Sequence, residues 1–216
     1  MVSPAPEVEV QDAATLILVR DPLDGPRILL GRRQRNAVFM AGVMVFPGGA
    51  VDAEDADVAL SGGLPPALAD HLSDGAAPAS AYPAAAIREL WEETGLVYGA
   101  AGEMAPVPPG WEGFAAKGAL PRAEGLALIF RAITPPGQVR RYDARFFIAD
   151  AKGLWGDIDD FSGASGELTE LRWVPVAELP TLDLAPVTRV VLTHVLQRLP
   201  DLSQPETVPL RRPGKI

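Results

Sequence analysis

The chain has 216 residues, a length typical of one domain, and 48% of them are hydrophobic, which allows a substantial core and excludes wholesale disorder. Its 28 acidic and 19 basic residues give a formal net charge of −9, which disfavours nucleic acid and anionic membranes as partners. It contains no cysteine, which excludes disulfides, zinc–thiolate sites and thiol catalysis.

The sequence shows no targeting or membrane segment. Residues 1–12 lack a basic region followed by an apolar core, and the longest apolar runs are too short to span a bilayer. We therefore expect a soluble, cytoplasmic protein without a membrane partner. Neither an internal repeat nor a long linker is present, so we expect one domain over residues 1–216, with an irregular, Pro-rich tail from about residue 200.

The first predicted elements are strands. Residues 13–20 and 27–33 are apolar segments separated by a turn that contains Pro and Gly, and residues 43–46 form a short strand that ends at a Pro-Gly-Gly turn. Residues 52–83 are acidic, rich in Ala and interrupted by Gly and Pro. A short helix is expected within them, at residues 66–72.

The rest of the chain is predicted to alternate between helices and strands. Residues 84–94 form a helix that ends at Gly95. Residues 99–122 are expected to be mostly loop, with a short helix near 111–117. Apolar residues at helical spacing predict an amphipathic helix at 185–199. Strands are expected at residues 126–133, 144–149 and 171–174.

The helix at residues 84–94 concentrates negative charge on one face. Glu89, Glu92 and Glu93 stand at positions i, i+3 and i+4, so their carboxylates project to the same side and repel one another. Such a stripe is commonly a solvated helix face; the alternative is a site for a hard divalent cation, which prefers carboxylate oxygens. The upstream turn with Gly48 and Gly49, where backbone can approach a ligand closely, favours the cation site.

These residues resemble the box of the Nudix hydrolase family, which reads G, five residues, E, seven residues, then R-E-U-x-E-E-x-G-U with U aliphatic. Gly49 takes the place of the opening glycine, Asp55 stands where the family has Glu, and residues 56–87 make 32 intervening positions instead of seven. The resemblance implies an α/β/α sandwich around a mixed β-sheet, with an insertion at about residues 56–83. The second half is matched at every fixed position, by Arg88, Glu89, Leu90, Glu92, Glu93, Gly95 and Leu96.

The resemblance also implies a chemistry, the metal-dependent hydrolysis of a diphosphate linkage in a nucleoside diphosphate derivative. Mg²⁺ or Mn²⁺ would neutralise the phosphoryl oxygens and activate a water, which an acidic protein needs for such a substrate. Glu92 and Glu93 are the expected metal ligands, Glu89 is a ligand or the base, and Gly49 belongs to the metal site. Arg88 is expected to orient the carboxylates through a bidentate ion pair, with its partner left open by the insertion.

A further metal ligand or general base is expected just before the strand at residues 171–174. Glu167 and Glu170 are both candidates, and the alternative for each is a solvated strand-end side chain. Arginines near the glycine turn and before a late strand are expected to meet substrate phosphates, with surface solvation as the competing explanation. The candidate substrate-binding residues are Gly48, Gly49, Arg32, Arg33, Arg35 and Arg141.

Several features are similar to one branch of the family, the coenzyme A and acyl-coenzyme A diphosphatases. They are the long insertion, residues 45–49 and residues 141–147, whereas the branch signature before the box is only partly present. The expected products are 3′,5′-ADP and a phosphopantetheine. An ADP-ribose or nucleotide-sugar pyrophosphatase stays open, as does a nucleotide-sensing domain without activity. A homodimer is also possible, and Trp111 and Phe114 are candidates for lining a pantetheine or acyl groove.

Overall fold

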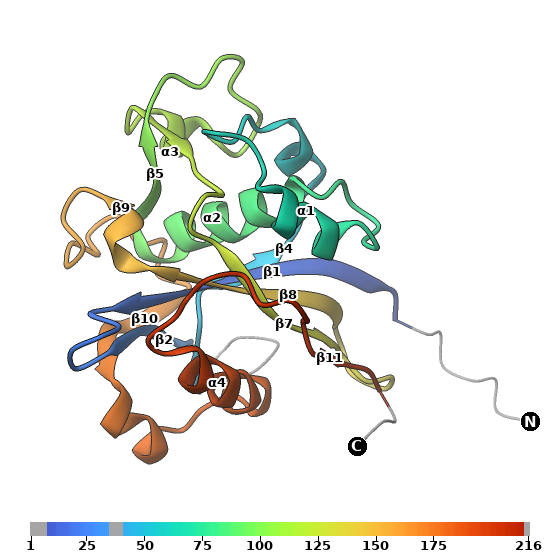
Figure 1. Ribbon diagram of the computed structural model, residues 1–216, viewed down its shortest axis with the longest axis vertical. Coiled ribbons are helices and arrows are strands. Elements are labelled where there is room, and N and C mark those ends of the chain that lie inside the picture. Colours follow the sequence, from blue (N-terminus) through green and yellow to red (C-terminus); the bar gives the residue numbers. More distant parts are fainter. Residues whose placement is uncertain (1–7, 35–40, 214–216) are drawn as a thin grey trace, which may run out of the picture.

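Figure 1 shows the computed structural model of the chain, which describes residues 8–34 and 41–213. The strands of its central sheet are β1 (Val10–Arg20), β2 (Arg27–Arg33), β3 (Met44–Val45), β4 (Gly48–Ala50), β7 (Ala127–Ile133), β8 (Arg141–Asp150), β10 (Leu168–Pro175) and β11 (Leu210–Arg211). The eight strands follow the order β10-β2-β1-β8-β7-β11, with β3 beside β2 and β4 beside β1. Pairs β1–β8 and β7–β11 are parallel and the others antiparallel, so the sheet is mixed, as predicted.

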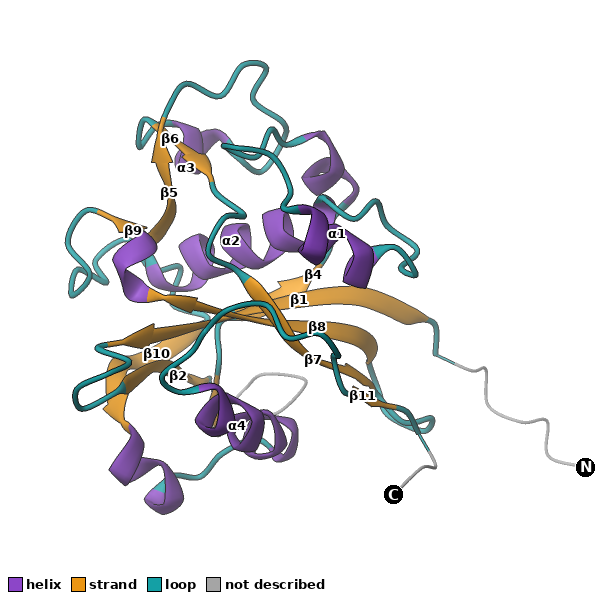
Figure 2. Cartoon of the chain, viewed as in Figure 1, coloured by secondary structure: helices purple, strands orange, loops and turns teal. Residues whose placement is uncertain are grey.

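Helices cover both faces of this sheet (Figure 2). Helix α1 (Pro66–Leu72) and helix α2 (Ala81–Thr94) lie on one side, and helix α4 (Pro186–Arg198) lies on the other. Alternate residues of β1 point to opposite faces, so Leu16 and Leu18 join the cluster under α2, while Ile17 and Val19 join the cluster under α4. The predicted α/β/α sandwich is therefore confirmed.

A smaller layer covers α2 on the side away from the central sheet. It contains helix α3 (Glu112–Ala115) and a three-stranded sheet in the order β6-β5-β9, formed by β5 (Val97–Ala101), β6 (Ala119–Pro121) and β9 (Leu154–Trp155). Residues 99–122 are mostly loop, as predicted, and α3 confirms the short helix expected near 111–117. The short strands β5 and β6 were not predicted, because their pairing with segments farther along the chain is not visible in local sequence.

The box insertion joins this layer. Ser61 donates its backbone N–H to the carbonyl oxygen of Pro121 at 2.8 Å. Val58 and Leu68 share one hydrophobic cluster with Trp111 and Phe114. The insertion contains a 3-10 helix at its start, η1 (Ala53–Asp57), and α1, as predicted. We refer to residues 56–80 and 97–125 together as the cap.

The predicted irregular tail is only partly irregular. Gln204 exchanges side-chain hydrogen bonds with both backbone groups of Leu128, and β11 then pairs in parallel with β7. This pairing covers the edge of the sheet, which explains why a Pro-rich segment becomes ordered. Two further 3-10 helices, η2 (Ala151–Gly153) and η3 (Val176–Thr181), connect the remaining elements. None of the helices in the described ranges combines the length and apolar character needed to cross a membrane.

Candidate functional site

Helix α2 presents the acidic stripe near its C-terminal end. The helix begins three residues earlier than predicted and ends where predicted, with Gly95 in the left-handed conformation (φ 78°) and its N–H bonded to the Trp91 carbonyl oxygen at 2.7 Å. A Cβ on Gly95 would lie 2.9 Å from the Cα of Gly163, so glycine is needed for both reasons. Acidic side chains near a helix C-terminus face the negative end of the helix dipole, and the last turn holds no basic residue to offset them.

Arg88 is locked in place by Asp55. The guanidinium donates from Nε to Asp55 Oδ1 at 2.9 Å and from Nη2 to Oδ2 at 3.0 Å, which is a bidentate ion pair. Both side chains are removed from solvent, with 5% exposure for Arg88 and 0% for Asp55. Arg88 Nη2 also donates to the carbonyl oxygen of Ala50 at 2.9 Å. The acidic residue of the first half of the box thus meets the arginine of the second half, although 32 residues separate their segments.

The remaining donor of Arg88 holds the neighbouring carboxylates. Its Nη1 lies 3.0 Å from Oε1 of Glu89 and 3.4 Å from Oε2 of Glu92. The Arg88 side chain therefore connects the buried Asp55 to the acidic face of α2. A guanidinium with fixed planar geometry restricts the rotamers of the side chains it contacts, so Arg88 orients Glu89 and Glu92.

The predicted glycine turn is a short strand, β4, which pairs with β1 and lies against α2. Gly48 donates its backbone N–H to Oε2 of Glu93 at 2.8 Å. A Cβ on Gly49 would lie 2.4 Å from the carboxylate carbon of Glu89. These glycines therefore allow the backbone to approach the carboxylates closely, which any side chain would prevent.

The three carboxylates have raised pKa values. Burial raises the pKa of Glu93 to about 8, and repulsion from Glu89 and Glu167 adds to this, whereas the Gly48 N–H and the charge of Arg33 act in the opposite direction. Burial also raises the pKa of Glu89 to about 7, against the opposing charge of Arg88. The pKa of Glu92 is raised in the same direction, again mainly by burial. The positive charges near the acidic face of α2 therefore do not offset the burial and mutual repulsion of its carboxylates.

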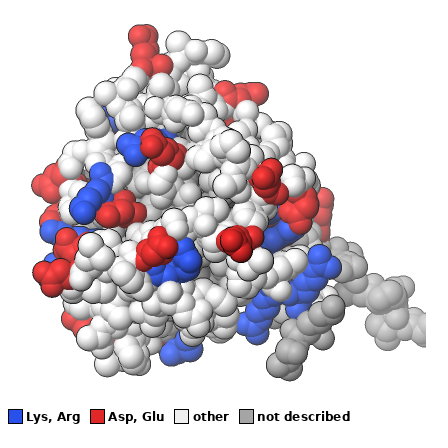
Figure 3. All heavy atoms as spheres, in the orientation of Figure 1, with Lys and Arg blue, Asp and Glu red and all other residues white. Residues whose placement is uncertain are grey.

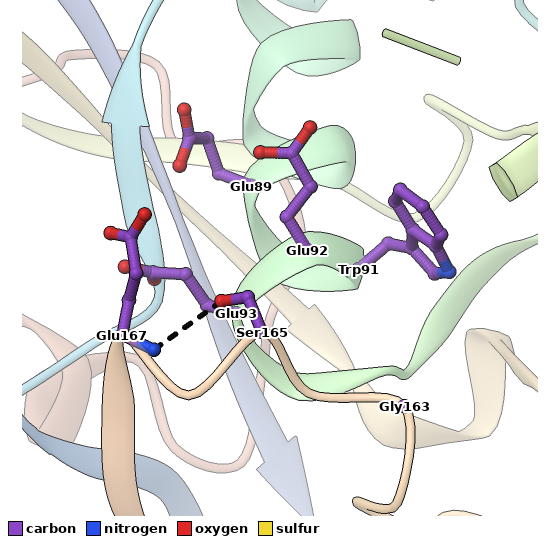
Figure 4. Close-up of a pocket in the computed structure, with 7 residues that line it drawn as sticks. All are labelled: Glu89, Trp91, Glu92, Glu93, Gly163, Ser165 and Glu167. Carbon is purple, nitrogen blue, oxygen red and sulfur yellow. Dashed lines mark hydrogen bonds between the residues drawn. The ribbon is translucent and has the colours of Figure 1, made fainter. Parts of the chain in front are cut away.

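The carboxylates border a cavity of about 230 Å³ (Figure 4). Glu167 enters it from the loop before β10, opposite Glu93. This loop is fixed by the Ser165 N–H, which donates to the carbonyl oxygen of Glu92 at 2.8 Å, and by pairing of Leu168 with Arg33 across β10 and β2. The lining residues are Glu89, Trp91, Glu92, Glu93, Gly163, Ser165 and Glu167.

The donor set fits a hard divalent cation, since every charged group that lines the cavity is a carboxylate. Within residues 8–34 and 41–213, however, no three acidic or His side chains are placed so that they could hold a metal ion as they stand. Repulsion among the carboxylates and the attraction of Arg88 for Glu89 and Glu92 account for this spacing. A cation would have to draw the side chains together.

Of the two carboxylates predicted before the late strand, the structure places Glu167 in the cavity and Glu170 outside it. Glu170 has a positive φ of 50° next to a bulge in β10, and its exposed carboxylate pairs with Nε of Arg32 at 2.9 Å. The bulge interrupts the alternation of the strand, so spacing alone could not separate the two residues. Arg32 is thereby held away from the cavity, with a second bond to the Gly42 carbonyl oxygen.

The other predicted arginines differ in position. Arg33 is half-buried, and its positive charge acts to lower the pKa of Glu93 at the cavity. Its Nε is buried with no hydrogen-bond partner among the described residues. Arg141 is buried at the start of β8, where it donates to the carbonyl oxygens of Thr134 and Val8 at 3.3 Å. Arg141 is not among the residues that line the cavity, and these two bonds fix the residues at the N-terminal end of β1, so its place in a substrate site stays a prediction. Arg35 lies outside the described residues.

Sequence reasoning missed the part played by Trp111. Its ring is fully buried, and its indole Nε1 donates to Oδ1 of Asp55 at 3.2 Å. A buried tryptophan needs a partner for its N–H, but nothing in the local sequence identifies one that lies 56 residues away. Phe114 is also fully buried, so the prediction that these two rings line a substrate groove was wrong.

No protein-family model matches the chain, and no curated protein matches it. Solved structures do match. A NUDIX hydrolase from Alicyclobacillus acidocaldarius shares 24% identity over 86% of this chain and 90% of its own, with a TM-score of 0.62. The NUDIX domain of Shewanella oneidensis NrtR, solved with ADP ribose, shares 12% identity over 91% and 93%, with a TM-score of 0.50. A MutT protein from Methanosarcina mazei Go1 shares 16% over 90% and 97%, also with a TM-score of 0.50. The fold of this chain is therefore the fold of the Nudix hydrolases.

Proposed function

We propose that this protein is a metal-dependent hydrolase of the diphosphate linkage in nucleoside diphosphate derivatives. The observation that carries the proposal is the buried ion pair between Asp55 and Arg88, which joins the two halves of the Nudix box despite the insertion. Three glutamates of α2 line one cavity, and the glycine strand contacts one of them, Glu93, through the Gly48 N–H. A purely structural role would not explain why a folded protein retains a cluster of repelling carboxylates at this position.

We propose that Glu89, Glu92 and Glu93 hold Mg²⁺ or Mn²⁺, with Gly49 providing the space in which the Glu89 carboxylate moves. When bound, the cation would neutralise the phosphoryl oxygens and lower the pKa of an attacking water. Arg88 keeps Glu89 and Glu92 on the cavity side of α2. Glu93 is fixed by the Gly48 N–H, so the helix and the strand hold the same carboxylate from two sides.

Glu167 is the favoured proton acceptor. It enters the cavity from a loop instead of from α2, so it faces the space where substrate and water would meet. Water adds to one phosphorus, the bridging P–O bond breaks, and the proton released by the water passes to the carboxylate. Arg33, whose charge lowers the pKa of Glu93 and whose Nε has no hydrogen-bond partner among the described residues, is the favoured contact for a substrate phosphate.

The substrate is proposed from the chemistry that the site supports. Coenzyme A or an acyl derivative is the leading substrate, on the sequence resemblance described above. The alternative is an ADP-ribose or nucleotide-sugar pyrophosphatase, for which the ADP-ribose complex of the NrtR domain is a precedent. The face shown in Figure 3 is mostly uncharged, with scattered acidic and basic side chains and several basic ones at its lower right. The net charge of −9 favours a small-molecule substrate over nucleic acid. The non-catalytic alternative is disfavoured because the box carboxylates are intact. A homodimer stays a prediction.

The test is hydrolysis of a panel of diphosphates by the purified full chain, with Mg²⁺, with Mn²⁺ and with excess EDTA. Product separation by chromatography identifies the bond that breaks. We expect turnover of at least one compound with either metal and none with EDTA. Turnover unchanged in EDTA would exclude the metal mechanism. A preference for ADP-ribose over coenzyme A would exclude the leading substrate and leave the hydrolase intact.

A further inference from the structure

The cap reaches the charged residues of the site at one point, the indole of Trp111. This residue precedes α3 in the cap, and its Nε1 donates to Oδ1 of Asp55 at 3.2 Å. The same carboxylate oxygen accepts from Arg88 Nε at 2.9 Å. The other oxygen, Oδ2, accepts from Arg88 Nη2 at 3.0 Å and from the Asp52 N–H at 2.9 Å. Asp55 is fully buried, so these donors replace the water that a carboxylate needs.

The geometry points to Trp111 as a positioning residue for the metal-binding carboxylates, and we propose that it acts on them through Asp55 and Arg88. The chain of contacts runs from the indole N–H to Asp55, from Asp55 to the guanidinium of Arg88, and from Nη1 to Glu89 and Glu92. Each link is a directional hydrogen bond. Removing the first donor takes away one of the four hydrogen bonds that fix the Asp55 carboxylate, and a shift of that carboxylate is passed to Arg88 because the pair is bidentate.

The side chain at position 55 explains why such a donor is required. The family motif has Glu at this position, and Asp is shorter by one methylene. An aspartate that reaches Arg88 has fewer rotamers than a glutamate. The indole of Trp111 supplies a donor to this shorter side chain, and the ring packs edge-on against Phe114 at 5.2 Å between ring centroids. Trp111 and Asp55 thus form a matched pair.

This inference rests on the proposed function, but it predicts an effect on metal binding that is measured without substrate. The test replaces Trp111 by benzothienylalanine, in which sulfur takes the place of the indole N–H and the ring shape is kept. Trp111→Phe is the second variant. The matched control is Phe147→Leu, which alters an equally buried ring of the same cluster that has no ring contact with Trp111 among the described residues. Mn²⁺ affinity is measured by electron paramagnetic resonance, and kcat and KM by the diphosphate assay.

We expect loss of the N–H to weaken Mn²⁺ binding by about 10-fold, the lower end of the range for residues that orient metal ligands. The value of kcat should fall by a similar factor while KM for the diphosphate changes little, since Trp111 does not line the cavity. The Phe147→Leu protein should match wild type in both. If Trp111→Phe does not fold, the benzothienyl variant still tests the effect of the N–H on Mn²⁺ affinity, because it keeps the ring shape and its packing in the core.

Unchanged Mn²⁺ affinity in the benzothienyl variant would overturn the proposal, and so would an equal loss in Phe147→Leu. The two hypotheses can fail separately. A wild-type protein that binds Mn²⁺ but hydrolyses none of the panel would refute the proposed function, while a Mn²⁺ affinity that depends on the Trp111 N–H would still support the positioning role. A wild-type protein that binds no Mn²⁺ would refute both.

Discussion

The two ends of helix α2 differ in how far their buried charges are offset by opposite charges and hydrogen-bond donors. At the N-terminal end, Tyr82 belongs to a cluster in which opposite charges and hydrogen-bond donors are balanced. At the C-terminal end, Glu89, Glu92 and Glu93 outnumber the cations that contact them. Both ends pack against the same sheet, so the contrast arises from the side chains and not from the fold.

The N-terminal cluster surrounds its carboxylate with hydrogen-bond donors. Asp12 accepts from the Tyr82 hydroxyl at 2.7 Å, from Arg145 Nη1 at 2.9 Å and from the Ala77 N–H at 3.1 Å. Burial acts to raise the pKa of Asp12, but these donors and the Arg145 charge outweigh it and the pKa is lowered. The Arg145 guanidinium also stacks 3.8 Å from the centre of the Tyr82 ring. The cluster ties the box insertion to β1 and β8, and its carboxylate is stabilised by these donors, although Nε and Nη2 of Arg145 are buried without a hydrogen-bond partner among the described residues.

At the C-terminal cluster, the pKa values of the carboxylates are raised instead of lowered. The pKa of Glu93 is raised to about 8 and that of Glu89 to about 7, so the metal-free protein holds protons there near neutral pH. Folding disfavours the charged form of these carboxylates in the metal-free protein. A bound cation would favour that charged form. Helix α2 therefore contributes hydrogen bonds that stabilise the fold at its N-terminal end and the proposed metal-binding carboxylates at its C-terminal end. The predictions below test this division of roles, from the largest effect to the smallest.

The largest effect is expected for Glu93→Gln. The substitution keeps an acceptor for the Gly48 N–H but removes a proposed metal ligand, so kcat should fall by roughly two to four orders of magnitude. The metal-free variant should be at least as stable as wild type at pH 8, because a buried carboxylate with a raised pKa is replaced by a neutral group. Steady-state kinetics and urea denaturation measure the two quantities. A variant with wild-type kcat would place the chemistry elsewhere.

Gly49→Ala should lower kcat by about 10- to 100-fold, the range found when residues that orient metal ligands are changed. The added Cβ would lie 2.4 Å from the carboxylate carbon of Glu89 and would displace it. The matched control is the same substitution in a Glu89→Ala background, where the space is vacant and the methyl group should cost nothing further. An equal loss in both backgrounds would show that Gly49 acts through the backbone of β4 instead.

Much of the fold and part of the site could be predicted from the sequence. The C-terminal half of α2, its end at Gly95 and the acidic stripe follow from local periodicity, because helix geometry fixes which side chains share a face. The partner of Arg88 could not be chosen, since a chain excursion of unknown path separates it from Asp55. Trp111 was missed for the same reason, and Glu170 was not distinguished from Glu167 because a bulge changes the alternation of β10. Local patterns predict elements; contacts between distant segments decide which side chains meet.

Metal affinity should rise with pH between about 6 and 9, by up to about 10-fold per pH unit for each proton released. The reason is that Glu89 and Glu93, with pKa values of about 7 and about 8, must lose their protons before they bind a cation. The sign for metal-free stability is the reverse. Because folding raises these pKa values above those of the unfolded chain, stability is greatest below pH 4.5 for these groups and falls as pH rises through 7 and 8.

The measurement is thermal unfolding with and without Mg²⁺ at pH 6 and at pH 8.5. The shift in Tm caused by Mg²⁺ should be larger at the higher pH, since binding to the folded state alone stabilises by mass action. The Glu93→Gln variant serves as the control and should show a smaller pH dependence. A metal-induced shift that is equal at both pH values would contradict the assignment of raised pKa values to the metal site.

Tyr82→Phe should produce the smallest effect, and it falls on stability alone. The variant keeps the ring that Arg145 stacks on and removes the hydroxyl that donates to Asp12, which costs about 1.5 kcal/mol for a bond to a charged acceptor. The cost should shrink at acidic pH, as Asp12 gains a proton below its lowered pKa. Tyr98→Phe is the matched control, because its buried hydroxyl is 3.5 Å from the Glu124 carbonyl oxygen. Urea denaturation should separate the two variants while kcat/KM stays at the wild-type value in both, since neither tyrosine lines the cavity.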